Sequence, residues 1–131
     1  AWDILAWLLA LLHLAAAAGK LLDVTGFIAV LQDYRLFPSG LLPVLAGALI
    51  ALEVSIAMGL AVRRWRKVAA MAAAGLAAAF LAVLSLTLAR GIALDNCGCF
   101  GTFLPRPLTG WTLVQDAALL LLCVALARRR A

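Results

Sequence analysis

The sequence predicts an all-α membrane domain: a four-transmembrane-helix bundle with a short amphipathic helix between the first and second spans. Two observations predict it. Of the 131 residues, 67% are hydrophobic and only 13% are charged, and the mean hydropathy is +1.13. Soluble domains are about half apolar and about a quarter charged. Four apolar runs also approach the ~20 residues that a helix needs to cross a bilayer. We expect one domain, covering residues 1–131, with lipid as its solvent.

The predicted spans cover about residues 2–22, 41–62, 68–89 and 111–127. The first run leads into further hydrophobic segments and not to a small-residue cleavage site, so it is interpreted as a retained helix. Between the first two spans, residues 24–35 place apolar side chains at helical spacing. These are Val24, Phe27, Ile28, Leu31 and Tyr34. This pattern predicts an extracytoplasmic amphipathic helix that lies in the membrane interface.

The positive charge is clustered at one side of the predicted bundle. The net charge is +5, and the main basic groups lie at residues 63–67 and 128–130. Both groups adjoin apolar runs, and no basic or aromatic groove pattern accompanies them, so nucleic acid is not an expected partner. The positive-inside rule places this side in the cytoplasm. Both termini are therefore expected inside, and the loop of residues 90–110 outside.

That loop contains the string Asp95-Asn96-Cys97-Gly98-Cys99-Phe100-Gly101. Glycine between two cysteines allows a small disulfide ring, and strained disulfides are the more readily reduced ones. A purely structural ring this small would stabilise little. The same thiols could bind a soft metal such as copper or mercury, but two ligands do not complete a metal site. The favoured hypothesis is a redox-active dithiol with Cys97 and Cys99 as its catalytic residues.

The neighbours of the thiols are supporting candidates, namely Asp95, Gly98, Phe100 and Gly101. Phe100, Trp111 and the amphipathic helix are expected to form an apolar roof over the thiols. The third cysteine, Cys123, lies near the opposite end of the last span and is interpreted as an apolar packing residue. If electrons pass through this protein, a quinone is therefore the simplest second partner.

Three ionisable residues within the spans, Lys20, Glu53 and Asp116, are further candidates, whereas His13 is interpreted as a packing residue. Glu53 lies about 18 Å from the outer end of its span, at the depth of His13, by the ~1.5 Å rise per residue. An ionisable group at that depth indicates function, and the alternative is a protonated glutamate bonded between helices. Lys20 and Asp116 share a depth near the outer end, so we expect them to pair there. Lys20 would then favour the thiolate form of the cysteines; the alternative is that it only anchors the helix at the membrane interface.

The whole pattern resembles the MauE branch of the MauE/DoxX family of redox-associated membrane proteins. The matching positions are Gly19-Lys20-Leu21-Leu22-Asp23, Phe27, Tyr34, Pro38, Glu53 and Cys97-Gly98-Cys99-Phe100-Gly101. The resemblance implies thiol–disulfide chemistry beside a periplasmic thioredoxin-like partner, in a bacterial inner membrane. It also implies a role in disulfide maturation of methylamine dehydrogenase or another exported client. The plan is similar to DsbB and vitamin K epoxide reductase, from which this chain departs by having one outer cysteine pair.

Overall fold

The computed structural model describes residues 2–102 and 105–129, and every regular element in these ranges is helical. In chain order they are α1 (Trp2–Leu22), α2 (Val24–Asp33), η1 (Ser39–Leu41), α3 (Leu42–Ala61), η2 (Arg63–Trp65), α4 (Arg66–Ala89) and α5 (Gly110–Arg128). Helices α1, α3, α4 and α5 are long and apolar enough to cross a membrane. The predicted fold class and four spans are confirmed, with boundaries within two residues of those expected.

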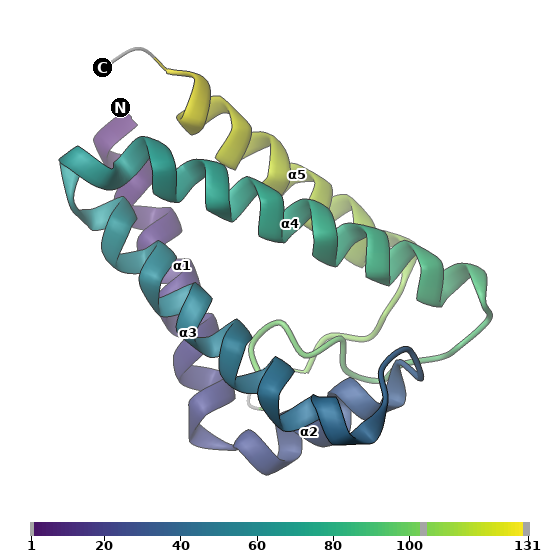
Figure 1. Ribbon diagram of the computed structural model, residues 1–131. Helices are drawn as coiled ribbons and strands as arrows, with labels where there is room; N and C mark the ends of the chain where they lie inside the picture. Colours follow the sequence, from purple (N-terminus) through teal and green to yellow (C-terminus); the bar gives the residue numbers. More distant parts are fainter. Residues whose placement is uncertain (1, 103–104, 130–131) are drawn as a thin grey trace.

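The four long helices form two side-by-side sets, α1 with α3 and α4 with α5. Successive spans run in opposite directions, and the two sets meet near the chain termini (Figure 1). They diverge towards the other end, where α2 and the loop between α4 and α5 lie in the opening. We call residues 90–109 the cysteine loop. The bundle is thus closed at the end that holds the chain termini, and α2 and the cysteine loop fill the opening at the other end.

Small side chains close the terminal end. Ala69, Ala70 and Ala73 of α4 are buried, and small residues let helices approach closely in a lipid environment. They pack with Leu60 of α3 and with Cys123 of α5, which is fully buried. Cys123 therefore sits in the core of the bundle, away from the cysteine loop, where a thiol packs as a small apolar group.

Helix α2 begins at an Asp23 cap, whose side chain accepts a hydrogen bond from the Gly26 amide at 3.0 Å. Phe27, Val30 and Leu31 are buried along one face of the helix. The helix ends at Asp33, and Arg35 follows in the left-handed region with φ of 54°. The predicted amphipathic helix is confirmed, two residues shorter than expected. Its location in the membrane interface stays a prediction.

Ion pairs hold the turn between α3 and α4 to the start of α1. Asp3 contacts Arg66 Nη1 at 2.5 Å and Arg63 Nη2 at 3.2 Å. This turn and both termini lie at the same end of the molecule (Figure 1). Arg128 ends α5 at that end, whereas Arg130 lies outside the described residues. The two basic groups identified in the sequence thus converge on one end of the bundle.

Candidate thiol site

The cysteine loop docks against the corner between α1 and α2. The loop and the helix come into backbone contact there: a Cβ atom added to Gly19 would lie 2.2 Å from the Phe100 carbonyl oxygen. A Cβ on Gly101, whose φ is +68°, would lie 2.4 Å from the Gly19 oxygen. The Thr102 hydroxyl donates to Asp23 at 2.8 Å. These contacts give a structural reason for the glycine and aspartate positions of the sequence motif.

Within the loop, two arms of the chain pair with each other. The Cys97 amide donates to the Arg106 carbonyl at 2.8 Å, and the Leu108 amide donates to the Leu94 carbonyl at 2.9 Å. The Asn96 side chain accepts from the Gly98 amide at 3.0 Å and donates to the Gly101 carbonyl at 2.8 Å. Pairing of the arms fixes Arg106 beside the cysteines.

The two cysteine sulfur atoms lie 3.6 Å apart, and both cysteines are free thiols. Gly98 turns the chain between them with φ of +85°. Cys97 is only 1% exposed, and its carbonyl accepts a hydrogen bond from the Tyr34 hydroxyl. Cys99 is half-buried. The two thiols are close enough to interconvert with a disulfide through a small rearrangement.

Arg106 is the cation at the thiols. Its Nη2 atom lies 2.9 Å from the Cys99 sulfur and 3.5 Å from the Cys97 sulfur. The same guanidinium bonds Gln115 at 2.9 Å and lies 3.6 Å from the Asp116 carboxylate. Sequence reasoning did not select Arg106. The available signal was its position as a cation a few residues after the cysteines, within the same loop.

These contacts favour a single negative charge shared by the thiols. The hydrogen bond with Cys99 lowers the pKa of Cys97 to about 6, and Arg106 adds to this effect against the opposing effect of burial. The same hydrogen bond and burial raise the pKa of Cys99 above its usual range. Burial alone would lower the pKa of Arg106, but the two sulfur atoms raise it. One thiolate is therefore available near neutral pH, and this is the reactive form of cysteine.

The expected Lys20–Asp116 pair is wrong. Lys20 pairs with Glu53 of α3, whereas Asp116 pairs with Arg106. Lys20 also lies 5.4 Å from the centre of the Phe27 ring. The sequence analysis placed Glu53 about 18 Å from the outer end of its span and Lys20 near that end, yet the two side chains meet; it did not predict the faces on which these side chains lie. The cation that promotes thiolate formation is consequently Arg106 and not Lys20.

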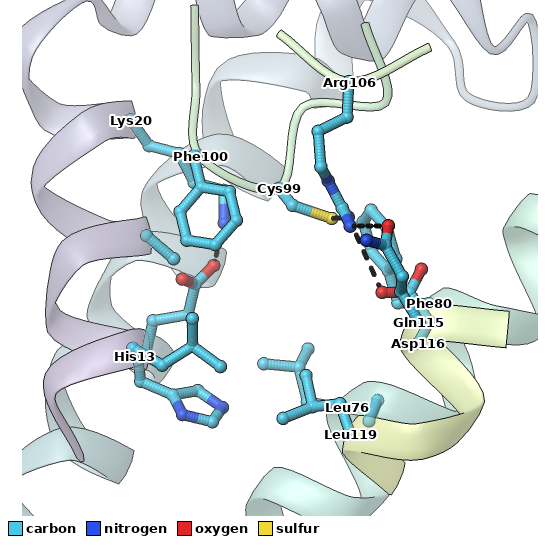
Figure 2. A pocket seen from close by; sticks show the side chains of 14 residues that line it. His13, Lys20, Leu76, Phe80, Cys99, Phe100, Arg106, Gln115, Asp116 and Leu119 are labelled. Atoms are coloured by element: carbon cyan, nitrogen blue, oxygen red, sulfur yellow. Dashed lines mark hydrogen bonds and ion pairs between the residues drawn. The ribbon is translucent and has the colours of Figure 1, made fainter. Parts of the chain in front are cut away.

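A cavity of about 250 Å³ lies beneath the loop, between the two helix sets. Cys99, Phe100 and Arg106 of the loop line it, together with mainly apolar side chains of the helices. Figure 2 shows Lys20 and Phe100 on one side of this space and Arg106, Gln115 and Asp116 on the other. His13 also lines it, and its Nδ1 atom is 2.8 Å from the Leu9 carbonyl. Glu53, which the sequence analysis placed at the depth of His13, lines the same cavity, and no hydrogen bond joins the two side chains within the described residues.

Of the remaining residues that the sequence analysis proposed for the site, some cover or line the thiol pair and others lie away from it. Phe27 and Val30 of α2 lie over Gly98, so the amphipathic helix does cover the thiol pair, and Phe100 lines the cavity. Trp111 is 67% exposed and does not belong to this roof. Asp95 is exposed, and the loop is instead organised by its neighbour Asn96. Within residues 2–102 and 105–129, the structure contains no group of three or more His, Cys, Asp or Glu side chains placed to hold a metal ion.

Comparison with known proteins agrees with the family resemblance inferred from the sequence motif. Residues 1–129 match the family described as Methylamine utilisation protein MauE. A protein of Paracoccus denitrificans named Methylamine utilization protein MauE is 36% identical over 119 residues. This alignment covers 91% of the present chain but 64% of the relative, so the chain spans less than two thirds of that protein. No solved structure matches the chain.

Proposed function

Because this chain belongs to the MauE family, we propose that it is a membrane thiol–disulfide oxidoreductase component whose reactive residues are Cys97 and Cys99. The family match confirms the resemblance inferred from the sequence motif. The observation that carries the proposal is the arrangement of the two sulfur atoms, 3.6 Å apart, with the Arg106 guanidinium 2.9 Å from one of them. A neighbouring cation favours the thiolate, which is the form that attacks or leaves in thiol exchange.

The exchange consumes one disulfide and forms another. With Cys97 and Cys99 oxidised, a thiolate of the partner attacks the Cys99 sulfur and Cys97 leaves as the thiolate. The second partner thiolate then attacks the mixed disulfide and releases Cys99. Two electrons pass in total from the partner dithiol to this protein; of the two partner protons, one is taken up by Cys99 and the other is released to the medium while Cys97 stays a thiolate. Cys97 suits the leaving role because thiols with a lower pKa leave faster, and its pKa is about 6.

The partner we propose is a periplasmic thioredoxin-like protein, which places the cysteine loop outside the cytoplasm. The supporting observation is that the basic groups lie with both termini at the opposite end, which is the cytoplasmic end by the positive-inside rule. The protein would then be a multi-pass component of a bacterial inner membrane. We further propose that its client is an exported disulfide-containing protein. Methylamine dehydrogenase is the candidate implied by the family resemblance, and the relative's name refers to methylamine utilization.

The electrons received at the thiols need a second carrier. Cys123 is buried in the terminal core and is separated from the loop by most of the length of α5, so it cannot relay them by thiol exchange. We propose a quinone as this carrier, because it is soluble in the membrane and accepts two electrons and two protons.

A soft-metal binding or transport function is the competing proposal, because thiolates bind copper(I) and mercury. Arg106 argues against it. Its guanidinium lies within hydrogen-bond distance of the Cys99 sulfur, where a metal ion would meet a like charge.

Mixed-disulfide trapping tests the proposed exchange. Cells producing Cys97→Ser are treated with acid and an alkylating agent, and disulfide-linked complexes are identified by mass spectrometry. We expect a thioredoxin-like protein linked through Cys99, the more accessible thiol, because Cys99 can attack an oxidised partner in the reverse exchange but Cys97 is no longer present to complete it. Cys123→Ser, in the terminal core, is the matched control and should trap nothing. The proposal fails if Cys97→Ser and Cys99→Ser both trap nothing and both retain activity. Stoichiometric copper binding that those two variants lose would favour the metal function.

A further inference from the structure

The cavity beneath the cysteine loop has apolar walls and, on each of two facing sides, one pair of charged side chains. Its walls include Leu12, Ala16, Leu76, Phe80 and Leu119, contributed by α1, α4 and α5. An apolar cavity of about 150 Å³ is large enough to hold benzene. The volume here, about 250 Å³, therefore fits one substituted six-membered ring.

The first polar group is the buried Lys20–Glu53 ion pair. Lys20 is 4% exposed and Glu53 is 3% exposed. Only Oε1 of Glu53 meets Lys20, and Oε2 is buried without a hydrogen-bond partner in the part of the chain that the structure describes. A buried polar atom of this kind is costly unless something bonds to it. The cost suggests a ligand that completes the site.

The second polar group is Arg106 with Asp116, beside the Cys99 sulfur. Arg106 Nε and Asp116 Oδ2 are also buried without a hydrogen-bond partner among the described residues. Figure 2 shows this group facing Lys20 and Phe100 across the cavity. Each side of the cavity thus offers a cation that can donate and a carboxylate that can accept. The ring of Phe100, which also lines the cavity, offers an aromatic face for stacking.

We infer that this cavity binds a quinone head group, with one carbonyl oxygen at Lys20–Glu53 and the other at Arg106–Asp116, next to Cys99. A quinone is a flat apolar ring with two opposed carbonyl acceptors, and its reduced form carries two hydroxyl donors in the same places. The cations match the acceptors of the oxidised form, and the carboxylates match the donors of the reduced form. This inference rests on the proposed thiol chemistry and names the site and partner of its second half.

The overall reaction balances without another oxidant or reductant. The Cys97 and Cys99 sulfur atoms form one S–S bond and give up two electrons. The quinone takes these electrons, and each of its two oxygens takes one proton, so that a hydroquinone results. At neutral pH the remaining thiol supplies one of these protons, and the medium supplies the other, which Cys97 lost when it ionised. The oxygen remote from Cys99 needs a local donor, and the Glu53 carboxylate is placed to take up a proton from the medium and pass it to that oxygen.

Direct binding tests the site. The purified full-length protein in lipid nanodiscs is titrated with ubiquinone-1, and binding is followed by equilibrium dialysis. Ala16→Leu fills the cavity, and we expect it to raise the Kd at least tenfold. Ala15→Leu, one residue away and exposed, is the matched control and should leave the Kd unchanged. Equal binding by wild type and Ala16→Leu would overturn the site.

Single-turnover kinetics test Glu53. The reduced protein is mixed with saturating ubiquinone-1, and hydroquinone formation is measured across pH. Glu53→Gln keeps the size of the side chain but removes the carboxylate that takes up and passes on the proton, and we expect the rate to fall about a hundredfold, the scale of general acid catalysis. Ser55→Ala, an exposed change on the same helix, is the control. Because Glu53→Gln leaves Lys20 unpaired, the double variant Lys20→Met/Glu53→Gln is also measured. If Glu53 serves only to pair with Lys20, the rate should recover in the double variant. Such recovery would refute proton transfer by Glu53.

The proposed function and this inference fail separately. Mixed-disulfide trapping reports on the thiols without quinone, and ubiquinone-1 binding reports on the cavity without a protein partner. If trapping succeeds but bound ubiquinone-1 leaves the thiols reduced, the quinone assignment is refuted and thiol exchange stands. If trapping fails while ubiquinone-1 binds and oxidises the thiols, the quinone assignment stands and the protein partner is refuted.

Discussion

The most direct test of the site's electrostatics is removal of the Arg106 charge. Arg106→Met keeps an unbranched side chain of similar reach but deletes the guanidinium that lies 3.5 Å from the Cys97 sulfur and 2.9 Å from the Cys99 sulfur. The hydrogen bond between the two cysteines is the largest cause of the lowered pKa of Cys97, and it remains in the variant. The part of the pKa shift that depends on Arg106 should be lost, so the pKa of Cys97 should rise.

The size of this rise follows from Coulomb's law and from the neighbouring carboxylate. Two unit charges 3.5 Å apart at an effective dielectric constant of ~20 interact by about 4.7 kcal/mol, whereas one pKa unit is about 1.4 kcal/mol. The Asp116 carboxylate, 3.6 Å from the same guanidinium, offsets much of that interaction. We therefore expect a rise of about one to two units. From a wild-type pKa of about 6, the thiolate fraction at pH 7 falls by about two- to tenfold.

The assay is the pH dependence of alkylation of the reduced protein by iodoacetamide, with Cys97 and Cys99 resolved by mass spectrometry. Arg90→Met is the matched control, because Arg90 belongs to the same loop but bonds the carbonyls of Tyr34 and Arg35. Its alkylation midpoint should equal that of the wild type. An unchanged midpoint in Arg106→Met would refute the assignment of Arg106 as the cation that favours the thiolate.

Three further outcomes are expected. Asp116→Asn should lower the alkylation midpoint of the thiols by less than about one unit, opposite in sign to Arg106→Met, because it removes the charge that competes for the guanidinium; a rise would contradict this. Gly19→Ala should push the cysteine loop away from α1, because the new Cβ would lie 2.2 Å from the Phe100 carbonyl oxygen, and it should therefore lower Tm and increase alkylation of Cys97. Gly75→Ala, where a Cβ would meet open space, is the control and should not lower Tm. Tyr34→Phe should cost about 1–3 kcal/mol by leaving the buried Cys97 carbonyl without its donor, as measured by chemical unfolding in detergent; no loss would show that the hydroxyl is dispensable.

The sequence predicted what depends on hydrophobicity and chain order. Span boundaries came within two residues, because apolar length is a strong constraint in a membrane. The amphipathic helix was predicted because Phe27 and Leu31 recur on one face and are buried there. Cys97 and Cys99 were identified by their spacing alone.

Side-chain partners inside the membrane were harder to predict. Rise per residue predicted a shared depth for Lys20 and Asp116, but these helices are apolar on all sides and so carry little signal for rotation. The error in pairing Lys20 with Asp116 came from that missing rotation. Arg106 was overlooked for a different reason: it reaches the thiols through hydrogen bonding between the two arms of an irregular loop, for which no periodic pattern exists.

The docked loop has a consequence for partner exchange. Cys97 is 1% exposed, and Cys99 faces the cavity, so a soluble protein can reach the thiols only after the loop moves away from α1. The hydrogen bond between Thr102 and Asp23, 2.8 Å long, joins loop and helix. Thr102→Val retains the side-chain shape but removes this bond, which is worth about 1 kcal/mol.

We therefore expect Thr102→Val to speed mixed-disulfide formation with the soluble partner about fivefold, the factor that about 1 kcal/mol represents in an opening equilibrium. Oxidation by ubiquinone-1 should not speed up, because that reaction uses the docked loop. Thr25→Val on the exposed face of α2 is the matched control. Equal acceleration of both reactions would mean that Thr102→Val loosens the site generally. An unchanged rate of partner exchange would mean that the loop does not limit access to the thiols.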